Sequence, residues 1–189
     1  MNRPANPASS EACIRVAVAA VDYEAMAQLI REYVAWLRMR YRQDEWFVTE
    51  VLDKQSLTNE LAALPEMYGA SRGKAFIAVA GNEVLGCGAY RALGGGACEM
   101  KRFFVFDRYR GRGIGRQLCH ALLAAARDDG FQEMKLDTGR LLSEAIGLYR
   151  SLGFRECEPY YDYPDRLLPY LMFMSRPLAD LPFRATAGT

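Results

Sequence analysis

The chain has 189 residues, of which 51% are hydrophobic and 25% charged, so it is long enough to bury one substantial core and too apolar to be a disordered protein. Its 24 basic side chains nearly balance 23 acidic ones, and the net charge of +1 excludes a global field that would draw the protein to nucleic acid or to an acidic membrane. A site for a polyanion must therefore be local.

The two ends are small and polar, which predicts flexible tails over residues 1–10 and 184–189 around a single domain of residues 11–183. The apolar run that follows the first tail is short and is interrupted by Arg15 and Asp22. Neither a signal peptide nor a membrane span is expected there. We therefore expect a cytoplasmic protein without a membrane partner.

The first third of the domain is predicted to be mainly helical. Residues 14–19 are typical of a short strand, and apolar side chains then recur at helical spacing from residue 21 to about residue 39. A polar and aromatic stretch over residues 40–49 leads into a second helix, which we expect over about residues 51–63 because Pro65 follows.

Strands dominate the middle of the chain. Residues 74–80, 84–93 and 97–105 predict three strands joined by hairpins, with a tight turn at Gly81-Asn82 and a looser one at residues 94–96. A glycine-rich loop then leads into an amphipathic helix that begins at Ile114 and should end at Gly130.

The last part predicts a strand over 134–137, a helix over about 141–152 closed by Gly153, and strands near 154–158 and 168–175. The fold class is therefore α+β. Its central strand-helix-strand unit predicts one parallel pair of strands.

Cysteine and histidine usage argues against disulfides and metals. The five cysteines form no Cys-x-x-Cys pair, and their odd number leaves one outside any disulfide framework, so we expect reduced, buried thiols. Since His120 is the single histidine, the usual zinc ligand sets cannot be assembled. We expect no metal.

The strongest chemical signal is the segment Tyr-Arg-Gly-Arg-Gly-Ile-Gly-Arg at residues 109–116, which opens the amphipathic helix. Free backbone N–H groups at a helix start, together with the positive end of the macrodipole, favour phosphate. The P-loop spacing is absent, and the dinucleotide fingerprint fails because Arg116 stands where its last glycine is needed.

The segment resembles the Arg/Gln-x-x-Gly-x-Gly/Ala signature of the GNAT superfamily of acyl-CoA-dependent N-acyltransferases, through Arg110, Gly113 and Gly115. Residues 145–154 are similar to the family's Ala-x-x-Leu-Tyr-x-x-x-Gly-Phe pattern. The resemblance covers about residues 70–175. It implies a mixed central sheet with splayed middle strands flanked by helices, and transfer of an acetyl group from acetyl-CoA to a primary amine by direct attack in a ternary complex.

The resemblance also implies where the cofactor binds. The backbone of the loop would hold the pyrophosphate, and the main chain of the third hairpin strand would pair with pantetheine like an added strand. For the aromatic side chains of that strand an ordinary core position is the alternative. The implied cofactor-binding residues are Phe103, Phe104, Val105, Arg110, Gly111, Arg112, Gly113, Ile114, Gly115 and Arg116.

Tyr149 aligns with the family tyrosine that protonates the leaving thiolate. Reference pKa values near 10 for a phenol and 8.5 for a thiol make that transfer uphill by about 2 kcal/mol, so its help is modest. The alternative is a core tyrosine on an apolar helical stripe.

A backbone N–H near Phe103 would stabilise the oxyanion. Leu142 replaces an asparagine that contacts the cofactor in several relatives, so that contact must be apolar or lost.

Activating the amine is the larger problem, since an alkyl amine of pKa about 10.4 lies about 4.6 kcal/mol from its neutral form at pH 7. Glu99 falls on the strand position that carries the general base in some relatives, where it would act directly or through a water. The alternative is an exposed Glu99 beside Lys101.

The acceptor is expected to be a small-molecule or peptide amine. Segments 41–47 and 158–165 mix aromatic and acidic residues, which suits a cationic amine, and Trp46 and Tyr161 are the substrate-binding candidates. The same mixture suits a solvated loop or the surface of a homodimer.

Two other functions stay open on the sequence. A non-catalytic acyl-CoA-binding sensor would keep the phosphate loop. A nucleic-acid module would use the five arginines between residues 102 and 116, but the near-zero net charge argues against nucleic acid as a partner.

Overall fold

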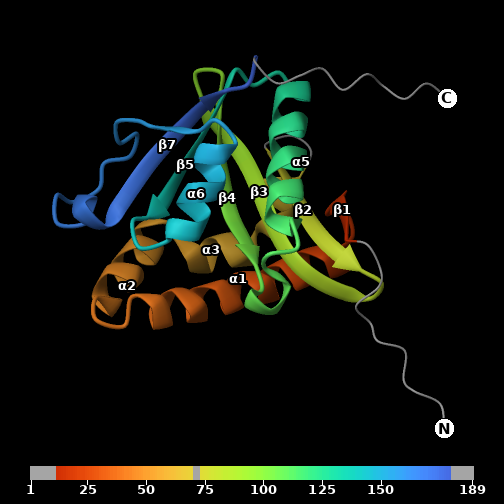
Figure 1. Cartoon of the computed structure of the whole chain (residues 1–189), viewed down its shortest axis with the longest axis horizontal. Coiled ribbons are helices and arrows are strands. Elements are labelled where there is room, and N and C mark those ends of the chain that lie inside the picture. The colour runs from red at the N-terminus through yellow and green to blue at the C-terminus, as the bar shows by residue number, and fades with distance from the viewer. Residues whose placement is uncertain (1–11, 70–72, 180–189) are drawn as a thin grey trace, which may run out of the picture.

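The computed structural model describes residues 12–69 and 73–179. Within them, seven strands form one sheet in the order β1-β2-β3-β4-β5-β7-β6 (Figure 1). Every neighbouring pair is antiparallel except β4 and β5, which are parallel as the sequence predicts. The strands are β1 (Cys13–Val16), β2 (Gly73–Ala80), β3 (Glu83–Gly94), β4 (Ala97–Val105), β5 (Glu133–Gly139), β6 (Arg155–Glu156) and β7 (Leu171–Pro177).

Helices cover both faces of this sheet (Figure 1). Strand side chains alternate between the faces, so in β2 Phe76 and Ala78 pack with α5 while Ala75 and Ile77 pack with α1 and α4. The helices are α1 (Ala20–Arg40), α2 (Glu45–Lys54), α3 (Leu57–Ala62), α4 (Leu64–Tyr68), α5 (Ile114–Asp128) and α6 (Ser143–Ser151), with short 3₁₀ turns at Asp107–Tyr109 and Leu168–Tyr170.

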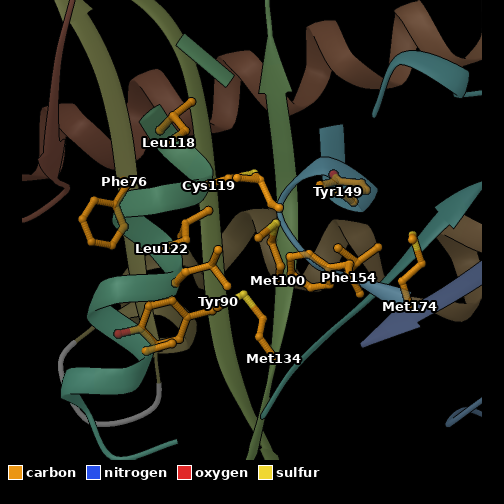
Figure 2. Packing of buried hydrophobic residues seen from close by; sticks show 14 of the residues in the cluster. Phe76, Tyr90, Met100, Leu118, Cys119, Leu122, Met134, Tyr149, Phe154 and Met174 are labelled. Atoms are coloured by element: carbon orange, nitrogen blue, oxygen red, sulfur yellow. The ribbon is translucent and has the colours of Figure 1, made fainter. Parts of the chain in front are cut away.

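The larger core lies between the sheet and the pair α5 and α6 (Figure 2). Leu118 and Leu122 of α5 are fully buried there against β2 and β3. Methionines from β4, β5 and β7 and the rings of Tyr149 and Phe154 extend the same core toward α6. Because α5 is fixed along its whole apolar stripe, its first turn is held in a defined position next to β4.

The predicted second helix is wrong in its extent. The structure has two helices there, α2 from Glu45 and α3 from Leu57, separated at Ser56, whose φ of 54° is left-handed. The buried stripe of α2 starts at Phe47, so the polar and aromatic stretch belongs to the helix and not to a linker. Pro65 lies in the first turn of α4, where a proline is tolerated because it has no N–H to lose.

The remaining elements agree with the predicted ones to within a few residues. The turn at Gly81 and the loose turn at Gly94–Gly96 both join antiparallel strands, and the φ of Gly81 is 58°. The C-terminal strand begins at Leu171 and not at residue 168, because residues 168–170 form a 3₁₀ turn. The α+β fold with its mixed sheet is confirmed, whereas the predicted tails lie outside the described residues.

All five cysteines are free thiols, as predicted. Cys87, Cys98 and Cys119 are buried and Cys157 is partly buried, whereas Cys13 is exposed, so the expected burial is wrong for Cys13. Burial raises the pKa of Cys87 and of Cys98 to about 12, which keeps both thiols protonated and unreactive at neutral pH.

Candidate active site

The glycine-rich loop before α5 is an open cradle of backbone groups. Gly111 and Gly113 have φ of 77° and 78°, in the left-handed region that favours glycine, and Gly113 is the residue that caps the start of α5. A Cβ added at either glycine would meet nothing within 4 Å. The first turn of α5 contains no acidic residue. The loop therefore presents unobstructed amides and the positive end of a 15-residue helix to the same space.

The three arginines of this loop are turned in different directions. Arg110 donates to the carbonyl of Val105 at 3.1 Å, and its guanidinium lies 4.5 Å from the centre of the Trp36 ring. Arg116 donates to the Ser151 hydroxyl at 3.0 Å. Arg112 lies over the Tyr109 ring at 5.6 Å. The backbone and the helix end are thus the features that these side chains leave open to an anion.

Strands β4 and β5 separate beside the loop. Their parallel pairing is confined to Ala97–Glu99 against Glu133–Lys135, and β4 continues to Val105 without a recorded β5 partner. On its other edge β4 carries a bulge, because Arg102 and Phe103 both lie opposite Gly88 of β3. This separation frees the backbone edge of residues 103–105, the segment for which the family resemblance implies contact with pantetheine.

The bulge is fixed by a buried ion pair. Arg102 has a φ of 54°, which is unusual for a residue with a side chain, and it binds both carboxylate oxygens of Glu60 in α3 at 2.6 Å. The Tyr68 hydroxyl donates to the same carboxylate at 2.7 Å. Burial alone would raise the pKa of Glu60, but the Arg102 guanidinium outweighs it and holds that pKa below its ordinary value. The bulge of β4 is therefore tied to α3 through Glu60, and through Tyr68 to α4.

A single cavity of about 400 Å³ joins these parts. Its cofactor end is lined by the glycine-rich loop, by residues 103–105 and by Leu148 and Tyr149 of α6. Its other end, which we call the acceptor end, is lined by the last turns of α1, by α2 and by β5. The acceptor-end residues are Leu37, Tyr41, Phe47, Val48, Val51, Leu52, Gln55, Lys101, Asp137, Thr138, Gly139 and Leu171.

Tyr149 of α6 lines the cofactor end next to Phe103 of β4. Its ring packs edge-on against Phe103 and Phe154, with ring centres 5.9 and 5.8 Å apart, so the packing expected of a core tyrosine is present. The tyrosine also lines the cavity, and among the described residues its hydroxyl has no hydrogen-bond partner. Within the described residues, every buried polar side-chain atom has a hydrogen-bond partner. Since the Tyr149 hydroxyl has none, its oxygen is not buried and is open to the cavity. Burial raises the pKa of Tyr149 well above its ordinary value, so the hydroxyl is protonated at neutral pH.

Glu99 lies outside the cavity lining. It is fully buried, so the alternative of an exposed Glu99 is wrong. Its carboxylate accepts hydrogen bonds from Tyr161 at 2.6 Å and from Tyr160 at 3.2 Å, and it pairs with Arg91 at 3.1 Å and with Lys101 at 3.5 Å. Of the partners of Glu99, Lys101 lines the cavity, so Glu99 would influence the amine through Lys101. The role of Glu99 as a base stays a prediction.

Asp137 is the carboxylate that sequence reasoning missed. It lines the cavity and accepts from Lys101 at 3.2 Å, from Gln55 at 3.0 Å and from Tyr163 at 3.3 Å. Burial alone would raise its pKa, but the Lys101 ammonium and the hydrogen bonds outweigh it, so the pKa lies below its ordinary value. The four residues come from β4, β5, the end of α2 and the 158–165 segment, and no local motif could have joined them.

The two predicted substrate residues also lie outside the cavity lining. Trp46 is 43% exposed and packs edge-on against Phe47 and Tyr170. The Tyr161 hydroxyl donates to Glu99 and accepts from Arg91 at 3.1 Å. Tyr161 therefore supports Glu99, and Trp46 supports α2, whose next residues line the acceptor end.

Leu142, which replaces the family's asparagine, is buried and lines the cavity, so any contact there is apolar.

The part of the chain that the structure describes holds no group of three acidic, cysteine or histidine side chains arranged for a metal ion. No helix within residues 12–69 and 73–179 has the length and apolar character needed to cross a bilayer.

Comparison with known proteins agrees with this geometry. The model of the acetyltransferase (GNAT) family matches residues 26–154. An uncharacterised N-acetyltransferase of Schizosaccharomyces pombe is 37% identical over 124 residues, 64% of this chain and 73% of that protein. The IAA acetyltransferase of Azospirillum brasilense is 34% identical over 157 residues, 82% of this chain and 92% of that protein.

Among solved structures, the PaiA N-acetyltransferase of Thermoplasma acidophilum in complex with coenzyme A has a TM-score of 0.63 with this chain. The match covers 88% of this chain and 99% of that chain at 19% identity, and at that identity the likeness concerns the fold. The matched family model includes the glycine-rich loop, the separated strands and Tyr149. This chain belongs to the acetyltransferase (GNAT) family.

Proposed function

We propose that this protein transfers an acetyl group from acetyl-CoA to a primary amine by direct attack in a ternary complex. The observation that carries the proposal is the single cavity that runs from the glycine-rich loop, between the separated strands, to the acceptor end. Such a cavity gives a thioester and an amine access to the same point from opposite sides. Family membership supports the use of an acyl-CoA donor.

The cofactor would be held mainly by the backbone. The amides of residues 111–116 suit the pyrophosphate, since left-handed glycines keep side chains away from it and α5 adds its positive end. The unpaired edge of residues 103–105 suits the pantetheine amides. Arg110, Arg112 and Arg116 would add charge around this cradle, whereas the side chains of Phe103 and Phe104 serve mainly in packing.

In the transfer step the amine nitrogen forms a bond to the acetyl carbon and the carbon–sulfur bond breaks. Tyr149 donates a hydrogen bond or its proton to the departing sulfur, because its hydroxyl is protonated and open to the cavity. A backbone N–H of the bulge near Phe103 would stabilise the oxyanion without a dedicated side chain. Since the pKa of Tyr149 is raised, full proton transfer is uphill and the hydrogen bond carries most of the benefit.

The amine must lose a proton before or during the attack. Two carboxylates are candidates for this step: Glu99, predicted from the sequence, which would act through Lys101, and Asp137, which lines the cavity. We favour Asp137 as the group that meets the ammonium, with Glu99 holding Lys101 beside it. Water in the open mouth of the cavity can take the proton away.

Initial-rate kinetics test this mechanism. With both substrates varied, direct attack requires reciprocal plots that intersect, and one acetylated amine must form for each coenzyme A released. Parallel plots, or an acetylated protein isolated after incubation with acetyl-CoA alone, would contradict direct attack. Acetyl-CoA binding without turnover on a broad panel of amines would instead favour the non-catalytic sensor.

A further inference from the structure

The acceptor end of the cavity has an apolar wall built by three segments far apart in the sequence. Leu37 and Tyr41 come from the end of α1, Val48 and Val51 from α2, and Leu171 from the start of β7. These side chains belong to one buried cluster on the α2 side of the molecule, which Leu37 flanks. The larger part of an acceptor bound here would therefore contact hydrocarbon and aromatic surface.

The charges at this end cancel each other. Within the described residues, Asp137 is the carboxylate that lines the acceptor end, and the Lys101 ammonium lies 3.2 Å from it. Gln55 and Tyr163 donate to the second oxygen of Asp137. The other carboxylate of the cavity, Glu144, is largely exposed and pairs with Arg40 at 3.0 Å. One ammonium of an acceptor can therefore share Asp137 with Lys101. A second ammonium would lose its water without gaining a charged partner.

The size of the cavity sets a further limit. About 400 Å³ is near the lower end of the range for small-molecule sites, and the thioester arm must occupy part of it. A large polycation, such as an aminosugar antibiotic, would need both more room and several free carboxylates.

We infer that the acceptor is a small amine with one basic nitrogen and an apolar, aliphatic or aromatic body. Its nitrogen lies toward Asp137 and its body lies against Val48, Val51 and Leu171. This inference rests on the proposed function, in which the nitrogen forms the new bond to the acetyl carbon, coenzyme A leaves as the thiol, and the proton of the amine passes to water. A mostly apolar wall gives binding through burial of hydrocarbon, which a polar or doubly charged body cannot match.

Three amines of similar length test the inference with the intact protein. Hexylamine has an apolar body and one charge, hexamethylenediamine adds a second charge at the far end, and diglycolamine replaces part of the hydrocarbon by ether and hydroxyl oxygens. Acetylated products are quantified by chromatography. We expect kcat/KM for hexylamine to exceed that for each of the other two by about tenfold or more, a difference of about 1.4 kcal/mol.

Equal or better use of the diamine or of diglycolamine would overturn the inference. So would acetylation of a peptide N-terminus with no turnover of hexylamine. Calorimetry with acetyl-CoA separates the two levels of the argument, because loss of acetyl-CoA binding would contradict the proposed function itself, whereas tight acetyl-CoA binding with the wrong amine preference contradicts only the acceptor class.

Matched variants of α2 locate the effect. Val51→Asp places a carboxylate in the acceptor end, whereas Thr49→Asp places the same charge on the exposed side of the same helix. We expect Val51→Asp to lower kcat/KM for hexylamine at least about tenfold and to shift the preference toward the diamine, because a new carboxylate can pair with its second ammonium. Thr49→Asp should change neither kcat/KM for hexylamine nor the preference between hexylamine and the diamine.

If Val51→Asp fails to fold by circular dichroism, Val51→Thr keeps the volume and adds one hydroxyl. A fall of about threefold in kcat/KM for hexylamine, with acetyl-CoA affinity unchanged, would support the inference. An unchanged preference in a folded Val51 variant would overturn it.

Discussion

The two ends of the cavity are built in different ways. The cofactor end is built mainly from one continuous stretch, from β4 through the glycine-rich loop into α5, to which α6 adds Leu148 and Tyr149, and it works mainly through backbone groups. The acceptor end is assembled from α1, α2, β5 and β7, and it works through side chains. A backbone site with local sequence spacing is readable from the sequence, whereas a side-chain site built from distant segments depends on the complete fold.

The buried pair of Glu60 and Arg102 ties the bulge of β4, which lines the cavity, to α3, so breaking this pair should have the largest effect on stability. Arg102→Met leaves a buried carboxylate without its partner, and we expect a loss of about 3–5 kcal/mol in the free energy of unfolding, measured by urea denaturation. The double variant with Glu60→Gln should recover much of this loss, because it removes the buried charge.

The exposed pair of Arg166 and Glu50 provides the control for that measurement. Arg166 is 67% exposed at its side chain, and Arg166→Met should leave the free energy of unfolding nearly unchanged, because solvent screens an exposed ion pair. Equal losses for Arg102→Met and Arg166→Met would contradict the role of the buried pair in fixing the bulge of β4.

Tyr149 lines the cofactor end, but it should affect the rate of transfer more than the binding of acetyl-CoA. Tyr149→Phe removes the hydroxyl that is open to the cavity, and we expect kcat to fall about 10²-fold while calorimetry finds acetyl-CoA affinity unchanged. Tyr170→Phe, which removes a hydroxyl bonded to Asp44 outside the cavity, should leave kcat unaltered. A normal kcat for Tyr149→Phe would reduce this residue to a packing role.

Asp137 should act on the acceptor end alone. Asp137→Asn is expected to raise KM for the amine about tenfold and to leave acetyl-CoA affinity within about twofold, because a hydrogen bond to a charged group contributes about 1.5–3 kcal/mol. Glu99→Gln gives the matched test of the carboxylate predicted from the sequence. If Glu99→Gln changes the pH dependence of kcat/KM and Asp137→Asn does not, then Glu99 and not Asp137 is the carboxylate that acts on the amine.

Breaking the ion pair of Arg15 and Asp22, which lies outside the cavity lining, should lower stability without changing the kinetics. Asp22 accepts from Arg15 at 2.6 and 2.9 Å and from two backbone N–H groups, and the hydrogen bond with Arg15 is the largest cause that lowers its pKa. Asp22→Asn should cost about 1 kcal/mol of unfolding free energy at pH 7, with unaltered kcat/KM.

The pH dependence of that cost follows from the direction of the pKa shift. The folded pKa of Asp22 lies below the unfolded value of about 3.9, so its stabilisation is fully present above pH 3.9 and is lost as the pH falls toward the folded value. Denaturation curves of the wild type and of Asp22→Asn should therefore converge in acid. A constant difference down to the lowest pH at which both fold would contradict the ion pair.

Much of the fold was predictable because hydrophobic periodicity and turn residues are local. The hairpin turn at Gly81, the start of α5 at Ile114 and the parallel strand pair follow from short segments. The break at Ser56 was not predictable, because a φ of 54° is uncommon for a residue with a side chain and the preference of serine does not indicate it.

For the site, the family motifs led to the glycine-rich loop and to Tyr149, and both line the cavity. In the 158–165 segment, Tyr161 and Tyr163 are turned inward to two different carboxylates, which the sequence does not reveal, and contact between Tyr161 and the acceptor stays a prediction. No sequence spacing reveals that Lys101 lies between Glu99 and Asp137, since Asp137 belongs to a strand that only the assembled sheet brings alongside β4.

The central claim is that bare backbone amides at the start of α5 bind the diphosphate of coenzyme A. Calorimetry with acetyl-CoA on Gly113→Asp and Gly95→Asp tests it directly, because both glycines have a positive φ and open space at Cβ, but only Gly113 lines the cavity. We predict that Gly113→Asp weakens acetyl-CoA binding by about tenfold or more through repulsion of the phosphates, while Gly95→Asp stays within about twofold of the wild type. Equal affinities for the two variants would contradict the account.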